Sequence, residues 1–211
     1  MLELSRFDAP QQTLNITLLQ CVFMGLSIKG SGACVHVNVT SSLLGSGVLE
    51  FEGSFGASSQ ILVAGSTLVT MSVHAIAFPE FSLGANSTLL VLDNRIEGSR
   101  YALRFSIGVV VDGGAIIVKG NTLRVTENNG AESAICVYAV VVKNGGYFDV
   151  ENNAMSSVIG VWFVKRATVS SAGLLRVAEC TFFGRTEFLI LRWCIYRTLS
   201  LFRVEHSGVW R

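Results

Sequence analysis

A nine-residue pattern of alternating apolar and polar positions recurs seven times along the chain. Residues 88–96, TLLVLDNRI, are the clearest copy, and the others begin at residues 15, 60, 115, 147, 174 and 201. Positions aligned with Leu89 and Val91 are apolar in every copy, whereas positions aligned with Leu90 and Leu92 also admit Thr, Lys, Arg, Asp and Glu. Alternation with period two predicts a strand that buries one face and exposes the other.

The spacing of the copies predicts a solenoid. From Ser66 onward, the position aligned with Asn94 recurs after 28, 27, 32, 27 and 27 residues, but the interval from Cys21 to Ser66 is 45. We therefore predict one solenoid segment over residues 1–211, with an irregular insertion around 40–57 and a divergent stretch at 185–199.

Second extended runs, rich in β-branched and aromatic residues, lie between the copies. They occupy residues 33–39, 101–111, 134–142, 158–164 and 187–196. Gly113-Gly114 and Gly145-Gly146 then turn the chain into the next copy. Strands and tight turns without helix signals predict an all-β fold, a right-handed parallel β-helix of the pectin-lyase-like type, with coils of about 27–32 residues.

A leucine-rich-repeat solenoid is the main alternative fold. The sequence L-x-V-x-x-N-x-I at 89–96 fits that repeat, in which cysteine can replace the asparagine, as at Cys21 and Cys180. Against it, the leucine expected three residues before Leu89 is Asn86, and the second half of each unit is strand-like. An antiparallel sandwich is a third, less favoured arrangement.

One column of the repeat is small and polar throughout. Such residues at a tight turn can hydrogen-bond the backbone and the next coil, so we interpret the column as a structural turn ladder and not as a row of binding residues. Its members are Cys21, Ser66, Asn94, Asn121, Asn153, Cys180 and Ser207.

Composition narrows the class of protein. The chain is 50% hydrophobic and 15% charged, with 5 Cys and a net charge of +1, which excludes disorder, a coiled coil and a disulfide-dense miniprotein. Residues 53–79 carry no charged side chain, but polar residues interrupt the run, which favours buried strands over a membrane span. Basic residues of the last fifty positions are scattered, so no nucleic-acid partner is expected.

No catalytic, cofactor-binding or metal site is predicted. The three histidines lack metal-ligand spacing, no cysteines form a C-x-x-C pair, and no phosphate-binding loop occurs. The four aspartates fall in different columns of the repeat or outside it. Asp149 with Arg176, and Lys119 with Glu151, are interpreted as lateral pairs on the sheet surface.

Three acceptor sequons make Asn15, Asn38 and Asn86 candidates for N-glycosylation. Alternation places Asn15 and Asn38 on the outward side of strands, and Asn86 precedes a strand at a turn. The first residues, MLELSRFDAP, lack the pattern of a signal peptide.

The block VVVDGGAIIVKGNTLRVTENNGAESAICVYAVVVKNGGYFDVENNAM at 109–155 resembles the dispersed gene family 1 surface proteins of trypanosomes, and residues 86–98 and 173–184 fit their recurring unit. The similarity covers 80–184 well and 1–79 loosely. It implies a glycosylated, pectin-lyase-like β-helix at the cell surface or secreted, with proposed adhesion to host matrix or cells. Family members are longer and carry C-terminal membrane helices, so the chain is expected to be a fragment or truncated copy.

The function that this resemblance implies is a non-catalytic surface segment that binds extracellular matrix proteins or glycans. Membrane association would come only through further parts of a longer protein, and neighbouring coils would be partners of a fragment. Two alternatives stay open: a pectin-lyase-like carbohydrate-active enzyme and a leucine-rich-repeat protein-binding module.

Overall fold

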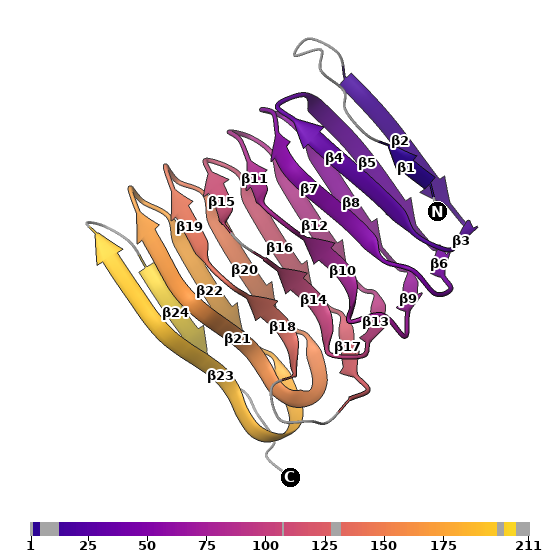
Figure 1. The fold of residues 1–211 in the computed structure, drawn as a ribbon. Helices are drawn as coiled ribbons and strands as arrows, with labels where there is room; N and C mark the ends of the chain where they lie inside the picture. The colour runs from indigo at the N-terminus through magenta and orange to yellow at the C-terminus, as the bar shows by residue number, and fades with distance from the viewer. Residues whose placement is uncertain (1, 5–12, 107, 128–131, 198–200, 206–211) are drawn as a thin grey trace.

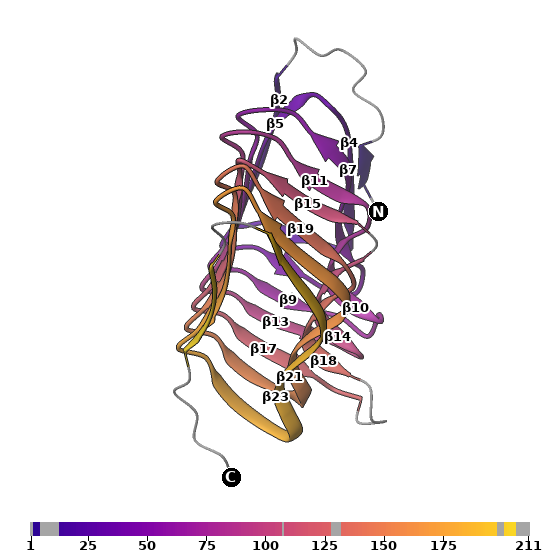
Figure 2. The ribbon, with the colours of Figure 1, turned by 90° about the vertical axis from the view of Figure 1, so that its left-hand side faces the viewer.

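The computed structural model describes residues 2–4, 13–106, 108–127, 132–197 and 201–205 (Figure 1). These residues form strands and turns, and no helix occurs among them. All strand pairs are parallel, and two sheets wind around one apolar interior as a β-solenoid (Figure 2). The predicted all-β parallel solenoid is confirmed.

One face of the solenoid is an eight-stranded sheet, which we call the repeat sheet. The predicted columns are in register in it: Leu89 pairs with Ile61 and Ile116. The sheet consists, in spatial order, of β2 (Thr13–Leu19), β5 (Cys34–Thr40), β8 (Gln60–Ala64), β12 (Thr88–Leu92), β16 (Ala115–Lys119), β20 (Tyr147–Glu151), β22 (Leu174–Ala178) and β24 (Leu201–Glu205).

β5 corrects the sequence interpretation of the first coils. Residues 33–39 were assigned to the second extended runs, but Val37 pairs with Ile16 and Ile61, so this segment is an eighth copy of the repeat. The 45-residue interval therefore holds a whole additional coil. The expected irregular insertion around 40–57 is wrong, because β6 (Leu43–Leu44) and β7 (Leu49–Phe55) pair in register with their neighbours.

The remaining strands form a 16-stranded sheet that folds around the interior in three segments. The first segment contains β3 (Val22–Phe23), β6, β9 (Thr67–Val69), β13 (Arg95–Gly98) and β17 (Thr122–Val125). The second contains β10 (His74–Phe78), β14 (Tyr101–Phe105) and β18 (Ser133–Val137), and the third contains β11 (Phe81–Leu83), β15 (Val109–Asp112) and β19 (Val140–Lys143).

Long strands join these segments. β7 pairs with both β10 and β11, and β4 (Leu26–Ser31) lies between β7 and β1 (Leu2–Leu4). β21 (Ala154–Ser170) pairs with β17, β18 and β19 in turn, and β23 (Thr181–Arg197) follows β21. The early coils are shorter because β7 passes from the second segment to the third without a loop. Most of the divergent stretch 185–199 falls in β23.

The leucine-rich-repeat alternative is wrong for the described residues, because three strands, and no helix, follow each strand of the repeat sheet in the central coils. None of the described residues forms a helix long and apolar enough to cross a membrane.

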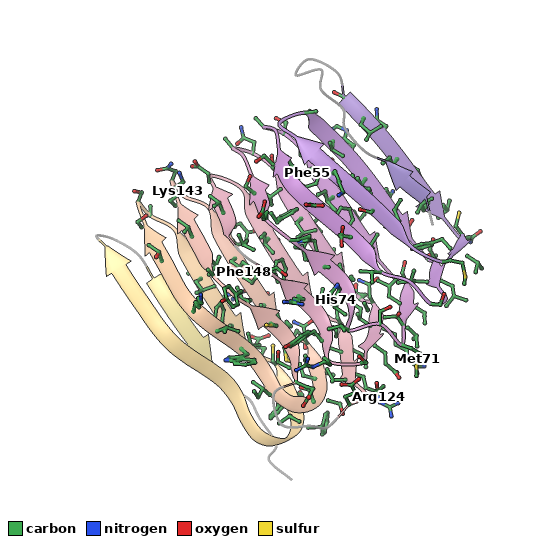
Figure 3. All side chains as sticks on the ribbon, viewed as in Figure 1. Phe55, Met71, His74, Arg124, Lys143 and Phe148 are labelled. Carbon is green, nitrogen blue, oxygen red and sulfur yellow. The ribbon has the colours of Figure 1, made fainter. Side chains whose placement is uncertain are left out.

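The interior is filled by aliphatic columns and an aromatic cluster. Phe78 stacks on Phe105 with ring centroids 4.5 Å apart, and Phe105 meets Phe148 edge-on at 5.2 Å. The cluster extends through Phe81 to Phe55, so it joins the coils between the two residues marked in Figure 3. Each fully buried side chain of this size contributes about 1.5–3 kcal/mol.

Candidate functional site

The polar column of the repeat forms a continuous hydrogen-bonded row inside the first corner of the coil. Asn121 Nδ2 donates to Val91 O at 2.8 Å and to Asn153 Oδ1 at 2.9 Å. Its own Oδ1 accepts from the backbone N–H and the Nδ2 of Asn94, at 2.9 and 3.0 Å. Asn94, Asn121 and Asn153, which we call the asparagine ladder, are 1–2% exposed.

Smaller residues continue the row on both sides of the asparagine ladder. Ser66 N–H donates to Asn94 Oδ1 at 2.9 Å, and Asn153 Nδ2 lies 3.9 Å from Cys180 Sγ. Burial raises the pKa of the Cys180 thiol. Ser42, which the sequence interpretation missed together with β5, accepts from Cys21 N–H at 3.2 Å. Ser207 lies outside the described residues.

The turn conformation explains why this column is polar. The residue before each member of the row has a positive φ of 49–68°, so the chain turns sharply and leaves backbone groups without strand partners. Side chains of the row occupy those groups. The residues with positive φ are Gln20, Ser41, Gly65, Asp93, Gly120, Asn152 and Glu179.

A second buried column, which sequence reasoning missed, lies at the corner before the repeat sheet. Val35 N–H donates to Ser59 Oγ, and Ser59 N–H donates to Ser87 Oγ, each at 3.1 Å. In later coils glycine takes this place: a Cβ on Gly146 would lie 2.8 Å from Val111 O. The signal in the sequence is a Ser or Gly directly before each strand of the repeat sheet.

The candidate glycosylation residues differ in accessibility. Asn15 and Asn86 are exposed, and Asn86 has φ of 58° at its turn. Asn38 is half-buried, and its Oδ1 is buried without a hydrogen-bond partner among the described residues. It lines a shallow depression of about 160 Å³ on the outer face of the repeat sheet, together with Asn15, His36 and Gln60.

Charged residues pair across neighbouring coils on the outer face of the repeat sheet. Arg176 Nε and Nη2 donate to the two carboxylate oxygens of Asp149 at 2.9 and 2.7 Å, and Nη2 also lies 2.6 Å from Glu151 Oε2. Lys119 Nζ is 3.4 Å from Glu151 Oε1. Hydrogen bonding to Asp149 raises the pKa of Arg176, so these carboxylates are held as partners of a permanent cation.

Histidine and cysteine side chains are dispersed. Among the described residues no group of three or more His, Cys, Asp or Glu side chains could hold a metal ion, and Cys21, Cys34, Cys136 and Cys180 are free thiols. His36 Nε2 lies 3.6 Å from Cys34 Sγ. Burial, with the charge of Arg104, lowers the pKa of His74.

Arginine, lysine and aromatic side chains gather on the outer side of the second segment. The guanidinium carbons of Arg100 and Arg104 lie 5.8 and 5.5 Å from the centre of the Tyr101 ring. One coil further, Tyr138 carries Lys165 Nζ at 4.6 Å from its ring centre. We call this surface, with Trp162, the aromatic–cationic strip: Arg100, Tyr101, Arg104, Tyr138, Trp162 and Lys165.

Strand register makes the strip continuous. Arg104 pairs with Cys136, and Cys136 pairs with Trp162, so β14, β18 and β21 present one row across three neighbouring coils (Figure 2). Cys136 is 4% exposed between its two larger neighbours, and burial raises the pKa of its thiol to about 11. The six members of the strip are half-buried or exposed.

Parallel strands wound in successive coils, apolar inward columns and buried polar corners define this chain as a repeat protein of the β-solenoid class. A family model described as the DGF-1 beta-sheet domain matches residues 12–181. The chain therefore belongs to the DGF-1 family, and the resemblance found in the sequence is confirmed. Neither the curated proteins nor the solved structures include a significant match.

Proposed function

We propose that this chain is a non-catalytic, surface-displayed β-solenoid segment that binds extracellular matrix proteins or glycans through its outer faces. The observation that carries the proposal is the division between the inside and the outside of the coil. The asparagine ladder is satisfied within the coil, whereas the aromatic–cationic strip faces outward on three neighbouring coils.

The arrangement of carboxylates supports a role in binding over a role in catalysis. Acid–base hydrolysis of a polysaccharide needs two carboxyl groups that face one substrate. Here Asp149 and Glu151 are both bound by Arg176, and Asp112 lies 2.9 Å from Lys143 Nζ. Carboxylates neutralised in this way serve as lateral contacts between coils.

Exposure of two sequons supports display outside the cell. Asn15 and Asn86 are exposed, so a glycan on either would project away from the interior. A glycan on Asn38 would have to leave the depression that its half-buried side chain lines. We therefore expect higher occupancy at Asn15 and Asn86 than at Asn38, which glycopeptide mass spectrometry of the secreted protein would measure.

Binding to immobilised matrix components tests the proposal. The whole chain, expressed with N-glycans, would be passed over laminin, fibronectin, collagen and heparin surfaces, with serum albumin as the control surface. We expect saturable binding to at least one of the four. Binding to none of them above the albumin surface would contradict the proposal.

A further inference from the structure

We propose that the aromatic–cationic strip is a binding site for a linear sulfated glycan. This inference rests on the proposed function, because it assigns one ligand class to one outer surface of the same solenoid. Three cations and three aromatic rings lie together on β14, on β21 and on the turn that follows β18.

The cations suit sulfate groups. A guanidinium presents a fixed fork of donors that matches an oxyanion, and a lysine ammonium supplies a point charge. Arg100 and Arg104 flank Tyr101, and Lys165 lies across Tyr138, so the aromatic rings hold the cations in place on the surface. Glu132, whose charge acts on Tyr101, is 1% exposed and presents no carboxylate to a ligand.

The aromatic side chains suit sugar rings. Tyr and Trp offer flat apolar faces with a polar edge, which match the C–H face and the hydroxyl groups of a pyranose. Trp162 is half-buried, and its Nε1–H, although buried, has no hydrogen-bond partner in the described part of the chain. An unpaired donor of this kind is costly, and a small movement of the ring would allow a ligand oxygen to accept from it.

The dimensions of the strip suit a linear chain laid along the solenoid axis. Arg104, Cys136 and Trp162 belong to three successive strands, and parallel strands are about 4.8 Å apart. The row therefore extends about 10 Å along the axis, which is the length of a disaccharide. A sulfate on alternate sugars would meet the arginines at one end of the strip and Lys165 at the other.

Heparin affinity of the whole chain tests the assignment. We expect saturable binding that weakens as sodium chloride is raised, because a polyanion releases bound counterions. The double variant Arg104→Gln and Lys165→Gln should lose about tenfold in affinity, since each charge-assisted contact to an anion is strong. Desulfated heparin should show no binding at the same concentrations.

A matched double variant removes the same charge elsewhere. Arg124 and Lys143 lie on the first and third segments, and Figure 3 marks them at opposite ends of the coil. Arg124→Gln with Lys143→Gln should bind heparin within about twofold of the unmodified chain, because both lie outside the strip. Thermal unfolding of both double variants would show that each is folded.

The possible results separate this inference from the proposed function. Equal heparin affinity in the two double variants would overturn the strip as the site. Binding to matrix proteins without binding to heparin would overturn the inference and leave the proposed function standing, and binding to none of these surfaces would overturn both. Equal affinity for polyglutamate and for heparin would replace the glycan with an acidic protein as the ligand.

Discussion

Two rows of side chains cross the same three coils and differ in where their polar groups find partners. The asparagine ladder is 1–2% exposed, and every member donates to a backbone carbonyl of the preceding coil. The aromatic–cationic strip lies outside, where cations contact only ring faces and the Trp162 N–H has no partner in the described chain. The comparison teaches that the inner row holds the coils together, while the outer row retains the capacity to bind.

The largest expected effect is the loss of one asparagine from the ladder. Asn121→Ala removes a side chain that bonds to Val91, Asn94 and Asn153, and leaves buried backbone groups without partners. We expect the free energy of unfolding to fall by about 2–4 kcal/mol. Urea unfolding measures this, with Thr122→Ala, an exposed neighbour, as the control. Equal losses in both variants would contradict a structural role for the ladder.

The glycine corner allows steric conflict to be separated from backbone strain. Gly146→Ala would place a Cβ 2.8 Å from Val111 O and 3.0 Å from Lys143 O, which we expect to cost about 1–3 kcal/mol. Gly145→Ala meets nothing within 4 Å, but its φ is +74°, so its cost should be only about 1 kcal/mol. If unfolding experiments reversed that order, close packing at this corner would not be the reason for glycine.

The outward pairs on the solenoid test whether partial burial gives an outer contact some share in stability. Asp149 and Arg176 have side chains 8% and 27% exposed and share two hydrogen bonds. A double-mutant cycle with Asp149→Asn and Arg176→Gln should give a coupling energy of about 1 kcal/mol.

The pair Lys143 and Asp112, exposed by 39% and 40%, is the matched case. Its coupling energy should be below about 0.5 kcal/mol, because solvent screens exposed ion pairs. Equal coupling in the two cycles would show that burial does not decide the strength of these contacts.

The smallest effect concerns pH. Burial, followed by the charge of Arg104, lowers the pKa of His74 from its ordinary value of 6.5. The unfolded chain therefore takes up a proton near pH 6.5 while the folded chain stays neutral, so stability is full above that pH and falls as the pH drops through it. The thermal unfolding midpoint should decrease between about pH 7.5 and 5.5.

A variant isolates this contribution from the other titrating groups. His74→Gln should make the dependence of the unfolding midpoint on pH shallower over the same range, because glutamine takes up no proton. An unchanged slope in the variant would assign the acid sensitivity to other residues.

The repeat sheet was predictable because its signal is local. Inward positions such as Leu89 and Val91 alternate with polar ones over nine residues, and each copy repeats that alternation. β5 was missed because its coil is short: the ladder positions Cys21, Ser42 and Ser66 are only 21 and 24 residues apart. A search for intervals near 27 therefore passed over a copy whose own alternation, with valines 35, 37 and 39 pointing inward, was correct.

The aromatic–cationic strip could not be predicted in the same way. Its row runs from Arg104 to Cys136 to Trp162, at intervals of 32 and 26 residues, whereas the asparagine ladder in the same coils has intervals of 27 and 32. Turns of different length before and after the second segment shift the two rows independently. Only the strand register brings these side chains together.

The most direct test of the account combines heparin affinity and unfolding free energy for the double variant Arg104→Gln and Lys165→Gln. If the outer row binds and the inner row stabilises, affinity falls about tenfold while the free energy of unfolding stays within about 0.5 kcal/mol of the unmodified chain. Unchanged affinity in a variant with unchanged stability would contradict the account.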